Sequence, residues 1–144
     1  MNGHIGRNGI SDNHIEGDGT TPSGFYDLGF AFGINENPGT ALEYRVLTPD
    51  HYWVSDPESS YYNQWVDHTH GYDVNKAEHL CAYTHNYTYS IVIEYNMPDA
   101  VPFAGSAIFL HCGSMPTSGC VAVSENNVID ILKWLKPGAK IIIV

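Results

Sequence analysis

Short apolar runs broken by glycine and proline are the feature that most constrains how this chain folds. The runs at residues 87–95 and 105–112 are rich in β-branched and aromatic side chains, and both are short for a helix. The same pattern recurs in shorter form elsewhere. We therefore expect strands at residues 25–32, 43–48, 87–95, 105–112 and 140–144, with a brief apolar continuation at 120–123.

Helical periodicity occurs once. Ser124 is a good N-cap, and Pro137 with Gly138 ends the pattern. Between them, four apolar residues are spaced i, i+3, i+4 and i+7: Val128, Ile131, Leu132 and Leu135. The sequence thus predicts a mainly β chain with one short helix near the C-terminus, at about 125–136.

Size and charge exclude some classes of function. The chain has 144 residues and no internal repeat, so we expect a single domain over residues 1–144. Six Lys and Arg stand against 16 Asp and Glu, a formal net charge of −10. Without a basic stripe to bind phosphates, a nucleic-acid partner is disfavoured. The acidic body suits an amine-bearing partner, or it serves solubility alone.

No targeting or membrane segment is visible. The first 19 residues are polar and glycine-rich, without the apolar stretch of a signal peptide. No run approaches the roughly 20 apolar residues of a membrane span. On the residues alone, the protein is either cytoplasmic or the trimmed part of an exported protein.

An aromatic segment at residues 51–65 shows neither helical nor strand periodicity, and we interpret it as a loop. The next stretch, 66–86, is polar and rich in histidine. Aromatic loops often line clefts, and the alternative is that they pack a long loop. The candidates for a substrate groove are Tyr52, Trp53, Tyr62, Trp65 and His79.

The strongest chemical signal is a histidine at a strand end followed by a cysteine. In an extended strand over 105–112, Phe109 and His111 share one face, whereas Leu110 and Cys112 share the other. A loop then leads back through Gly119 to Cys120. A thiol near an imidazole is an activated nucleophile, because the ring takes its proton and favours the thiolate. Backbone N–H groups near the cysteine are placed to face an oxyanion.

Metal and disulfide roles for the cysteines are weaker hypotheses. His79, Cys81, His111, Cys112 and Cys120 offer zinc ligands, but no Cys-x-x-Cys pair is present and His111 and Cys112 diverge. We therefore expect no metal and no cofactor. Three cysteines do not make a disulfide scaffold. Cys112 is interpreted as core packing, or as the partner of Cys81 in an oxidising compartment.

These residues resemble a known family. GSAIFLH followed by TSGCVAV is similar to the active-site segment of the L,D-transpeptidase catalytic domain, of the YkuD type. The resemblance extends upstream to GRNG at 6–9, EGDGTTPSGFYDLGFAFG at 16–33, DHYWVSDPESSYYNQWV at 50–66 and AEHL at 77–80. The chain looks like a branch with Ser-Gly-Cys where His-Gly-Cys is usual.

The resemblance implies a β-sandwich of mixed strands with one short helix, and an acyl transfer on peptidoglycan stem peptides. Cys120 would attack the bond after a diamino acid and release D-alanine, with His111 as base. Gly119 and Ser118 would shape the oxyanion site. An amine of a second stem would then take the acyl group. The resemblance also places a monomer outside the cell or facing the wall.

Three departures and two alternatives accompany this hypothesis. Ser118 stands where the family has His, Ala122 stands where an Arg often holds a substrate carboxylate, and the nine positions from His111 to Cys120 are fewer than usual. One alternative is an L,D-carboxypeptidase or stem-trimming hydrolase, with water as acceptor. The other is a non-catalytic wall-binding module with an inert cysteine.

Overall fold

A seven-stranded mixed sheet runs through the middle of the computed structural model, which describes residues 1–144. Its strands are β1 (Gly3–His4), β4 (Gly24–Gly33), β5 (Tyr44–Val46), β9 (Ser90–Ile93), β10 (Phe109–Cys112), β11 (Val121–Val123) and β12 (Lys140–Ile143). They lie in the order β1-β11-β10-β9-β4-β12, and β5 also pairs with β4. The pairs β10–β11 and β4–β5 are parallel, and the others are antiparallel.

The remaining elements are short. A three-stranded sheet contains β6 (Tyr52–Val54), β7 (Trp65–Val66) and β8 (Ala77–His79), and a two-stranded sheet contains β2 (Ile10–Ser11) and β3 (Thr21–Pro22). Two 3₁₀ turns, η1 (Val74–Lys76) and η2 (Leu80–Ala82), flank β8. The α-helix is α1 (Glu125–Trp134). None of these helices has the length and apolar character needed to cross a membrane.

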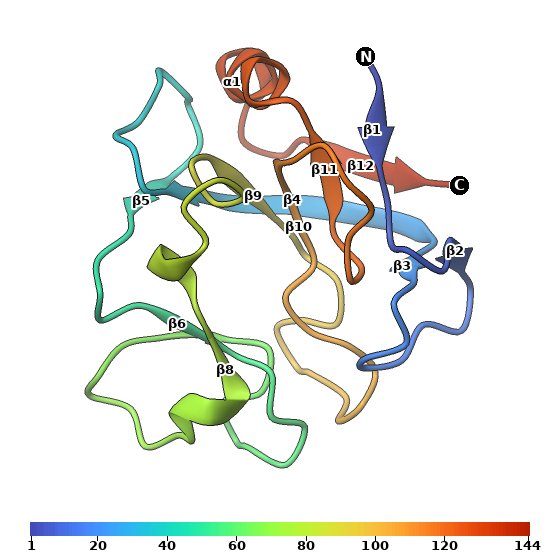
Figure 1. Ribbon diagram of the computed structural model, residues 1–144, viewed down its shortest axis with the longest axis vertical. Helices are drawn as coiled ribbons and strands as arrows, with labels where there is room; N and C mark the ends of the chain where they lie inside the picture. Colours follow the sequence, from blue (N-terminus) through green and yellow to red (C-terminus); the bar gives the residue numbers. More distant parts are fainter.

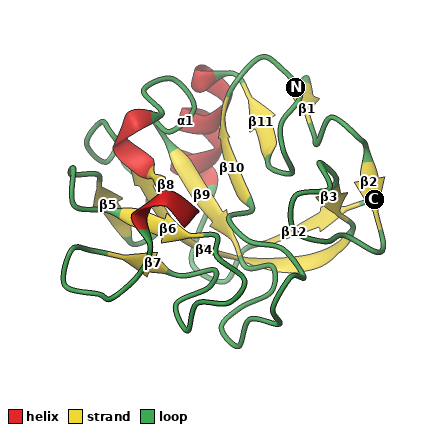
Figure 2. Cartoon of the chain, turned by 60° about the horizontal axis from the view of Figure 1, so that its bottom comes forward, coloured by secondary structure: helices red, strands yellow, loops and turns green.

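One face of the main sheet packs against α1, which lies at the top of Figure 1 and beside β10 in Figure 2. Val128 and Leu132 of the helix are fully buried there, together with Leu110 and Cys112 of β10. Ser124 caps the helix, because its hydroxyl accepts the N–H of Asn127. The amphipathic stripe predicted from the sequence therefore forms this layer.

The other face of the main sheet packs against the three-stranded sheet, at the bottom of Figure 1. Trp53 of β6 meets the ring of Phe109 edge-on, with centroids 4.9 Å apart, and Phe32 meets Phe109 at 5.1 Å. The indole N–H of Trp53 donates to Asn63, so the buried ring keeps a hydrogen-bond partner. The molecule thus has two hydrophobic clusters, one on each face of the main sheet.

The mainly β class with mixed sheets and one late helix is confirmed. Most strands are shorter than predicted, whereas β4 is slightly longer than the predicted 25–32. The segment 87–95 is regular only at β9, because Tyr87 donates its N–H into a turn at Tyr83. The segment 105–112 becomes regular only at β10, because Ala107 has a φ of 55° and interrupts the extended backbone. The helix ends at Trp134, since Leu135 is already extended.

The prediction that residues 51–65 form a loop is wrong at the two ends of the segment, although 55–64 are irregular as predicted. This segment contributes β6 and β7, and the polar segment after it contributes β8. The side chains of Trp53 and Val54 are buried against the main sheet, so tertiary packing stabilises strands that have no regular alternation. Three two-residue strands, β1, β2 and β3, also lie in the glycine-rich segment at 1–24.

Candidate active site

Parallel pairing of β10 with β11 brings Cys120 and His111 to the same cleft. Leu110 is the register partner of Val121, so Cys120, one residue before β11, lies opposite Phe109. The backbone N–H of Phe109 donates to the Cys120 sulfur at 3.4 Å. Both His111 and Cys120 line a cleft of about 790 Å³. A loop of eight residues between the two strands thus folds the cysteine back beside the strand that carries the histidine.

The two adjacent residues His111 and Cys112 point to opposite faces, as predicted. Cys112 is buried in the cluster under α1, and its thiol donates to the carbonyl of Tyr89 at 3.5 Å. The ring of His111 meets the ring of Tyr87 edge-on at 5.5 Å on the cleft side. Cys81 packs against the opposite cluster from Cys112, and all three cysteines are free. The alternative of a bridge between Cys81 and Cys112 is therefore wrong.

The thiol of Cys120 is protonated in the resting protein. It is buried and donates to the carbonyl of Ala107 at 3.2 Å. Burial, and then the negative charge of Glu78, raise the pKa of the Cys120 thiol to about 12. The sequence analysis expected a favoured thiolate. The structure differs because the sulfur lies in an apolar cluster with a carboxyl group for a neighbour.

His111 is neutral, and its hydrogen bonding determines which nitrogen is free. Its Nδ1 lies 2.8 Å from the carbonyl oxygen of Cys112, so in the neutral ring Nδ1 carries the proton and Nε2 the lone pair. Burial lowers the pKa of His111 below its usual 6.5. No hydrogen bond joins this ring to the Cys120 thiol, which is engaged with Ala107. The ring is nevertheless in the protonation state that a general base requires.

Gly119 and Ser118 both line the cleft, and the structure separates their roles. The N–H of Gly119 donates to the Thr117 hydroxyl at 3.1 Å, whereas the N–H of Cys120 has no partner within the protein. A Cβ at Gly119 would lie 2.9 Å from the carbonyl oxygen of Thr20, so this close approach requires glycine. Cys120 therefore offers a free backbone N–H beside its own thiol.

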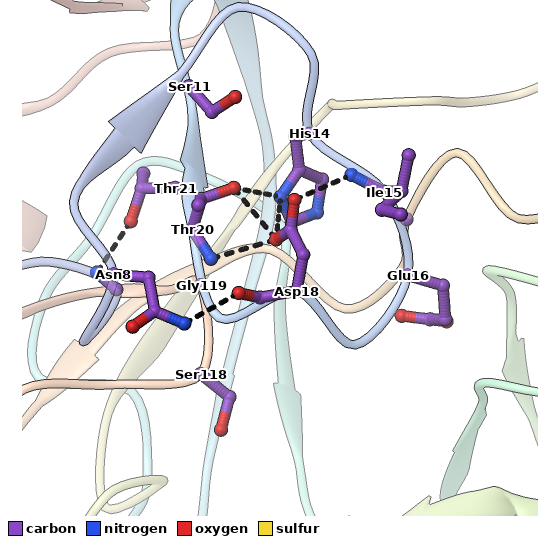
Figure 3. A network of polar contacts seen from close by, with 12 residues as sticks. Asn8, Ser11, His14, Ile15, Glu16, Asp18, Thr20, Thr21, Ser118 and Gly119 are labelled. Atoms are coloured by element: carbon purple, nitrogen blue, oxygen red, sulfur yellow. Dashed lines mark hydrogen bonds and ion pairs between the residues drawn. The ribbon is translucent and has the colours of Figure 1, made fainter.

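A polar network missed by the sequence analysis supports this close approach (Figure 3). His14 Nδ1 lies 2.9 Å from the Thr20 hydroxyl and 3.1 Å from the Asp18 carboxylate. That carboxylate also accepts the N–H groups of Thr20 and Ile15 at 2.8 and 3.0 Å. The network fixes the Thr20 carbonyl against Gly119. The Asp-Gly-Thr sequence, typical of an Asx turn, was the available clue.

Asn63 is a second positioning residue that the sequence did not reveal. It is buried, and its Oδ1 accepts the N–H of Ala107 at 3.0 Å and the indole N–H of Trp53 at 2.9 Å. Ala107 is the residue whose carbonyl holds the Cys120 thiol and whose φ is 55°. Asn63 therefore stabilises an unfavourable backbone conformation directly beside the Cys120 thiol. An asparagine in an aromatic, polar segment carries no sequence pattern for this role.

None of the five predicted groove residues lines the cleft. Trp53 and Tyr62 are buried, and Trp65 packs edge-on against Phe32 at 5.7 Å. Tyr52 stacks on His79 at 4.4 Å, within the three-stranded sheet. Their aromatic surface is used for packing, which was the alternative interpretation. The aromatic side chains in the cleft are instead Tyr83 and Tyr87.

The charged side chains of the cleft are few and of both signs. Arg7 is its one Lys or Arg side chain, and it donates to the Ser118 hydroxyl at 3.3 Å. Glu16 accepts from Tyr62 and Ser106, and Glu78 accepts from the hydroxyl of Tyr87 at 2.7 Å. Burial raises the pKa of Glu78 to about 7. No three His, Cys, Asp or Glu side chains come together in a geometry that would hold a metal ion.

Fold and site together define a mainly β domain in which a neutral histidine and a buried cysteine face one polar cleft. A family model, the YkuD L,D-transpeptidase catalytic domain, matches residues 4–143. The chain belongs to this family, whose activity is directed at peptidoglycan. Comparison with curated proteins gave no match. Comparison with solved structures gave none either.

Proposed function

We propose that the protein is a cysteine acyltransferase of the L,D-transpeptidase type, with peptidoglycan stem peptides as substrates. The observation that carries this proposal is the convergence of Cys120, neutral His111 and the free N–H of Cys120 on one cleft. Membership of the YkuD family supports the substrate class. The working protein would then be a monomer on the wall side of the membrane.

The acylation step uses the hydrogen bonding already described. The Cys120 thiol leaves the Ala107 carbonyl and gives its proton to Nε2 of His111 as the sulfur attacks the peptide carbonyl after the diamino acid. The N–H of Cys120 donates to the developing oxyanion. A C–S bond forms, the C–N bond breaks, and His111 passes the proton to the departing D-alanine. Because the resting thiol is protonated, proton transfer accompanies attack rather than preceding it.

The second step regenerates the enzyme. An amine of another stem attacks the thioester, a C–N bond forms and the C–S bond breaks. His111 takes the proton that the attacking amine loses and passes it to the thiolate of Cys120. Water in place of the amine gives hydrolysis, which is the carboxypeptidase alternative.

The branch with Ser-Gly-Cys belongs to this proposal too. Ser118 brings the guanidinium of Arg7 to the cleft through its hydrogen bond, whereas Ala122 is fully buried on β11. A cation from the N-terminal segment therefore lies beside the nucleophile loop, where a charged side chain at position 122 is absent. The backbone of Arg7 is itself fixed, because its N–H donates to Thr117 at 2.8 Å.

The test is an assay on stem tetrapeptides with mass spectrometry of the products. The wild-type protein should release D-alanine and form cross-linked dimers. Cys120→Ala should abolish both products, and the matched control Cys112→Ala should retain them, because Cys112 faces α1. Activity that persists in Cys120→Ala would contradict the proposal. Trimmed stems without dimers would identify water as the acceptor, and no product from soluble wild-type protein would favour the wall-binding alternative.

A further inference from the structure

Glu78 is a desolvated carboxyl group in the cleft that no cation of the protein neutralises. Its only side-chain contact is the hydrogen bond from the Tyr87 hydroxyl at 2.7 Å. The ion pairs of the molecule all lie elsewhere. A carboxylate has about four acceptor positions, so most of those of Glu78 are open. Glu78 is half-buried, and a carboxylate charge that is partly removed from water without a partner is unfavourable, so an incoming cation would relieve it.

The position of Glu78 connects it with the nucleophile. Tyr87, which donates to Glu78, lies edge-on to both His111 and Phe109 at 5.5 and 5.6 Å. Phe109 in turn donates its N–H to the Cys120 sulfur at 3.4 Å. Glu78 and Cys120 also line the same cleft. The carboxyl group and the Cys120 thiol therefore face the same cleft, and the charge of Glu78 acts on that thiol.

The groups around Glu78 do not compete with a cation. The titratable groups that influence it are Tyr87 and Glu16, and it influences Tyr83 and Cys120 in return. None of them is cationic. The Glu78 carboxylate therefore lacks a positively charged partner, and a cationic ligand would supply one.

We infer that Glu78 is the binding site and the first base for the acceptor amine of the second stem. This inference rests on the proposed function and adds a catalytic residue to it. The acceptor arrives as an ammonium group, pairs with the Glu78 carboxylate and gives it one proton. The amine nitrogen then attacks the thioester carbon, so that a C–N bond forms and the C–S bond breaks. His111 takes the second proton and returns it to the Cys120 sulfur, and Glu78 loses its proton to water.

The chemistry of Glu78 fits this task. An ordinary Glu, with a pKa near 4.3, is a weak base toward an ammonium group near 10.4. Burial raises the pKa of Glu78 to about 7, closer to the pKa of the ammonium group, so Glu78 is a stronger base than an ordinary Glu. At neutral pH a large fraction of Glu78 is still ionised. Water needs no such partner to enter the cleft. Glu78 therefore favours aminolysis over hydrolysis.

The test measures how the acyl-enzyme divides between amine and water in Glu78→Gln. One tetrapeptide serves as donor, and three acceptors are compared: a stem with a free side-chain amine, water, and hydroxylamine, which is uncharged at pH 7. The initial burst of D-alanine should stay within about twofold of wild type. Dimer formation should fall at least tenfold, while transfer to hydroxylamine should stay unchanged. Glu58→Gln is the matched control, because Glu58 is exposed and lies outside the cleft.

Each result has a defined consequence. An unchanged ratio of dimer to hydrolysed stem in Glu78→Gln would overturn the inference and leave the proposed function intact. An equal loss with all three acceptors would also overturn it, since that is the pattern of a purely structural role. No D-alanine burst in the wild type would overturn both proposals. If Glu78→Gln does not fold, Tyr87→Phe, which removes the anchor of the carboxyl group, should shift the same ratio toward hydrolysis.

Discussion

A cysteine is buried against each face of β10, and the surroundings of the two cysteines differ. Toward α1, Leu110 and Cys112 lie in an apolar cluster where the nearest polar partner of the thiol is a backbone carbonyl. Toward the cleft, His111 lies beside Tyr87, and Cys120 approaches from the next strand. Both thiols have raised pKa values, about 11 for Cys112 and about 12 for Cys120. Burial and pKa therefore do not distinguish the two cysteines, whereas access to a neutral imidazole does.

The largest expected effect comes from His111→Asn on the cleft face. The change removes the proposed base and retains an amide that can donate to the Cys112 carbonyl. We expect kcat/KM on tetrapeptide stems to fall about 100- to 10,000-fold. The free energy of unfolding, measured by urea denaturation, should change much less. Near-normal turnover would show that catalysis does not require this histidine, and it would contradict the distinction drawn between the two faces of β10.

The converse experiment is Leu110→Ala on the α1 face. Leu110 is buried among the helix side chains, so the cavity should lower the free energy of unfolding by about 2–5 kcal/mol. At a temperature where the variant is folded, kcat/KM should remain within a few-fold of wild type. A large loss of kcat/KM in fully folded protein would mean that the two faces are coupled.

The pH dependence of activity sharpens the role assigned to His111. Burial lowers the pKa of this ring below 6.5, and only the neutral ring accepts the thiol proton. The acylation step, measured as release of D-alanine, should therefore persist at pH 6.5 and decline only in more acidic solution, roughly tenfold per pH unit below the pKa of the ring. A kcat/KM profile measures this directly. A decline that begins above pH 6.5 would contradict the neutral, desolvated histidine.

The smallest expected effect is on stability, through Glu78. The pKa of Glu78 in the folded state, about 7, lies above its usual value of 4.5, so the folded state binds more protons than the unfolded state between these two pH values. The contribution of Glu78 to the free energy of unfolding is therefore fully present below pH 4.5 and is lost as the pH rises to 7. Relative to wild type, the Glu78→Gln variant should accordingly have a lower free energy of unfolding at pH 5 than it has at pH 8. Equal effects in urea denaturation at both pH values would show that the carboxyl group is not desolvated.

The sequence by itself determined the mainly β class, the helix near the C-terminus and the divergence of His111 from Cys112. These features depend on local periodicity, which a single chain displays directly: alternation in a strand and a 3.6-residue repeat in a helix. The family resemblance also rested on contiguous motifs, and the family match over residues 4–143 agrees with it.

Only the tertiary structure shows which residues surround the Cys120 thiol. Trp53 and Trp65 of the aromatic segment pack in the second cluster, because the three-stranded sheet places them against Phe109 and Phe32. Asn63, Thr20 and Glu78 reach the cysteine from segments between 42 and 100 residues away. No local pattern encodes such contacts, because they arise when separate segments close over one face of the sheet. The protonation states of His111 and Cys120 follow from that burial, so they too belong to the fold rather than to the motif.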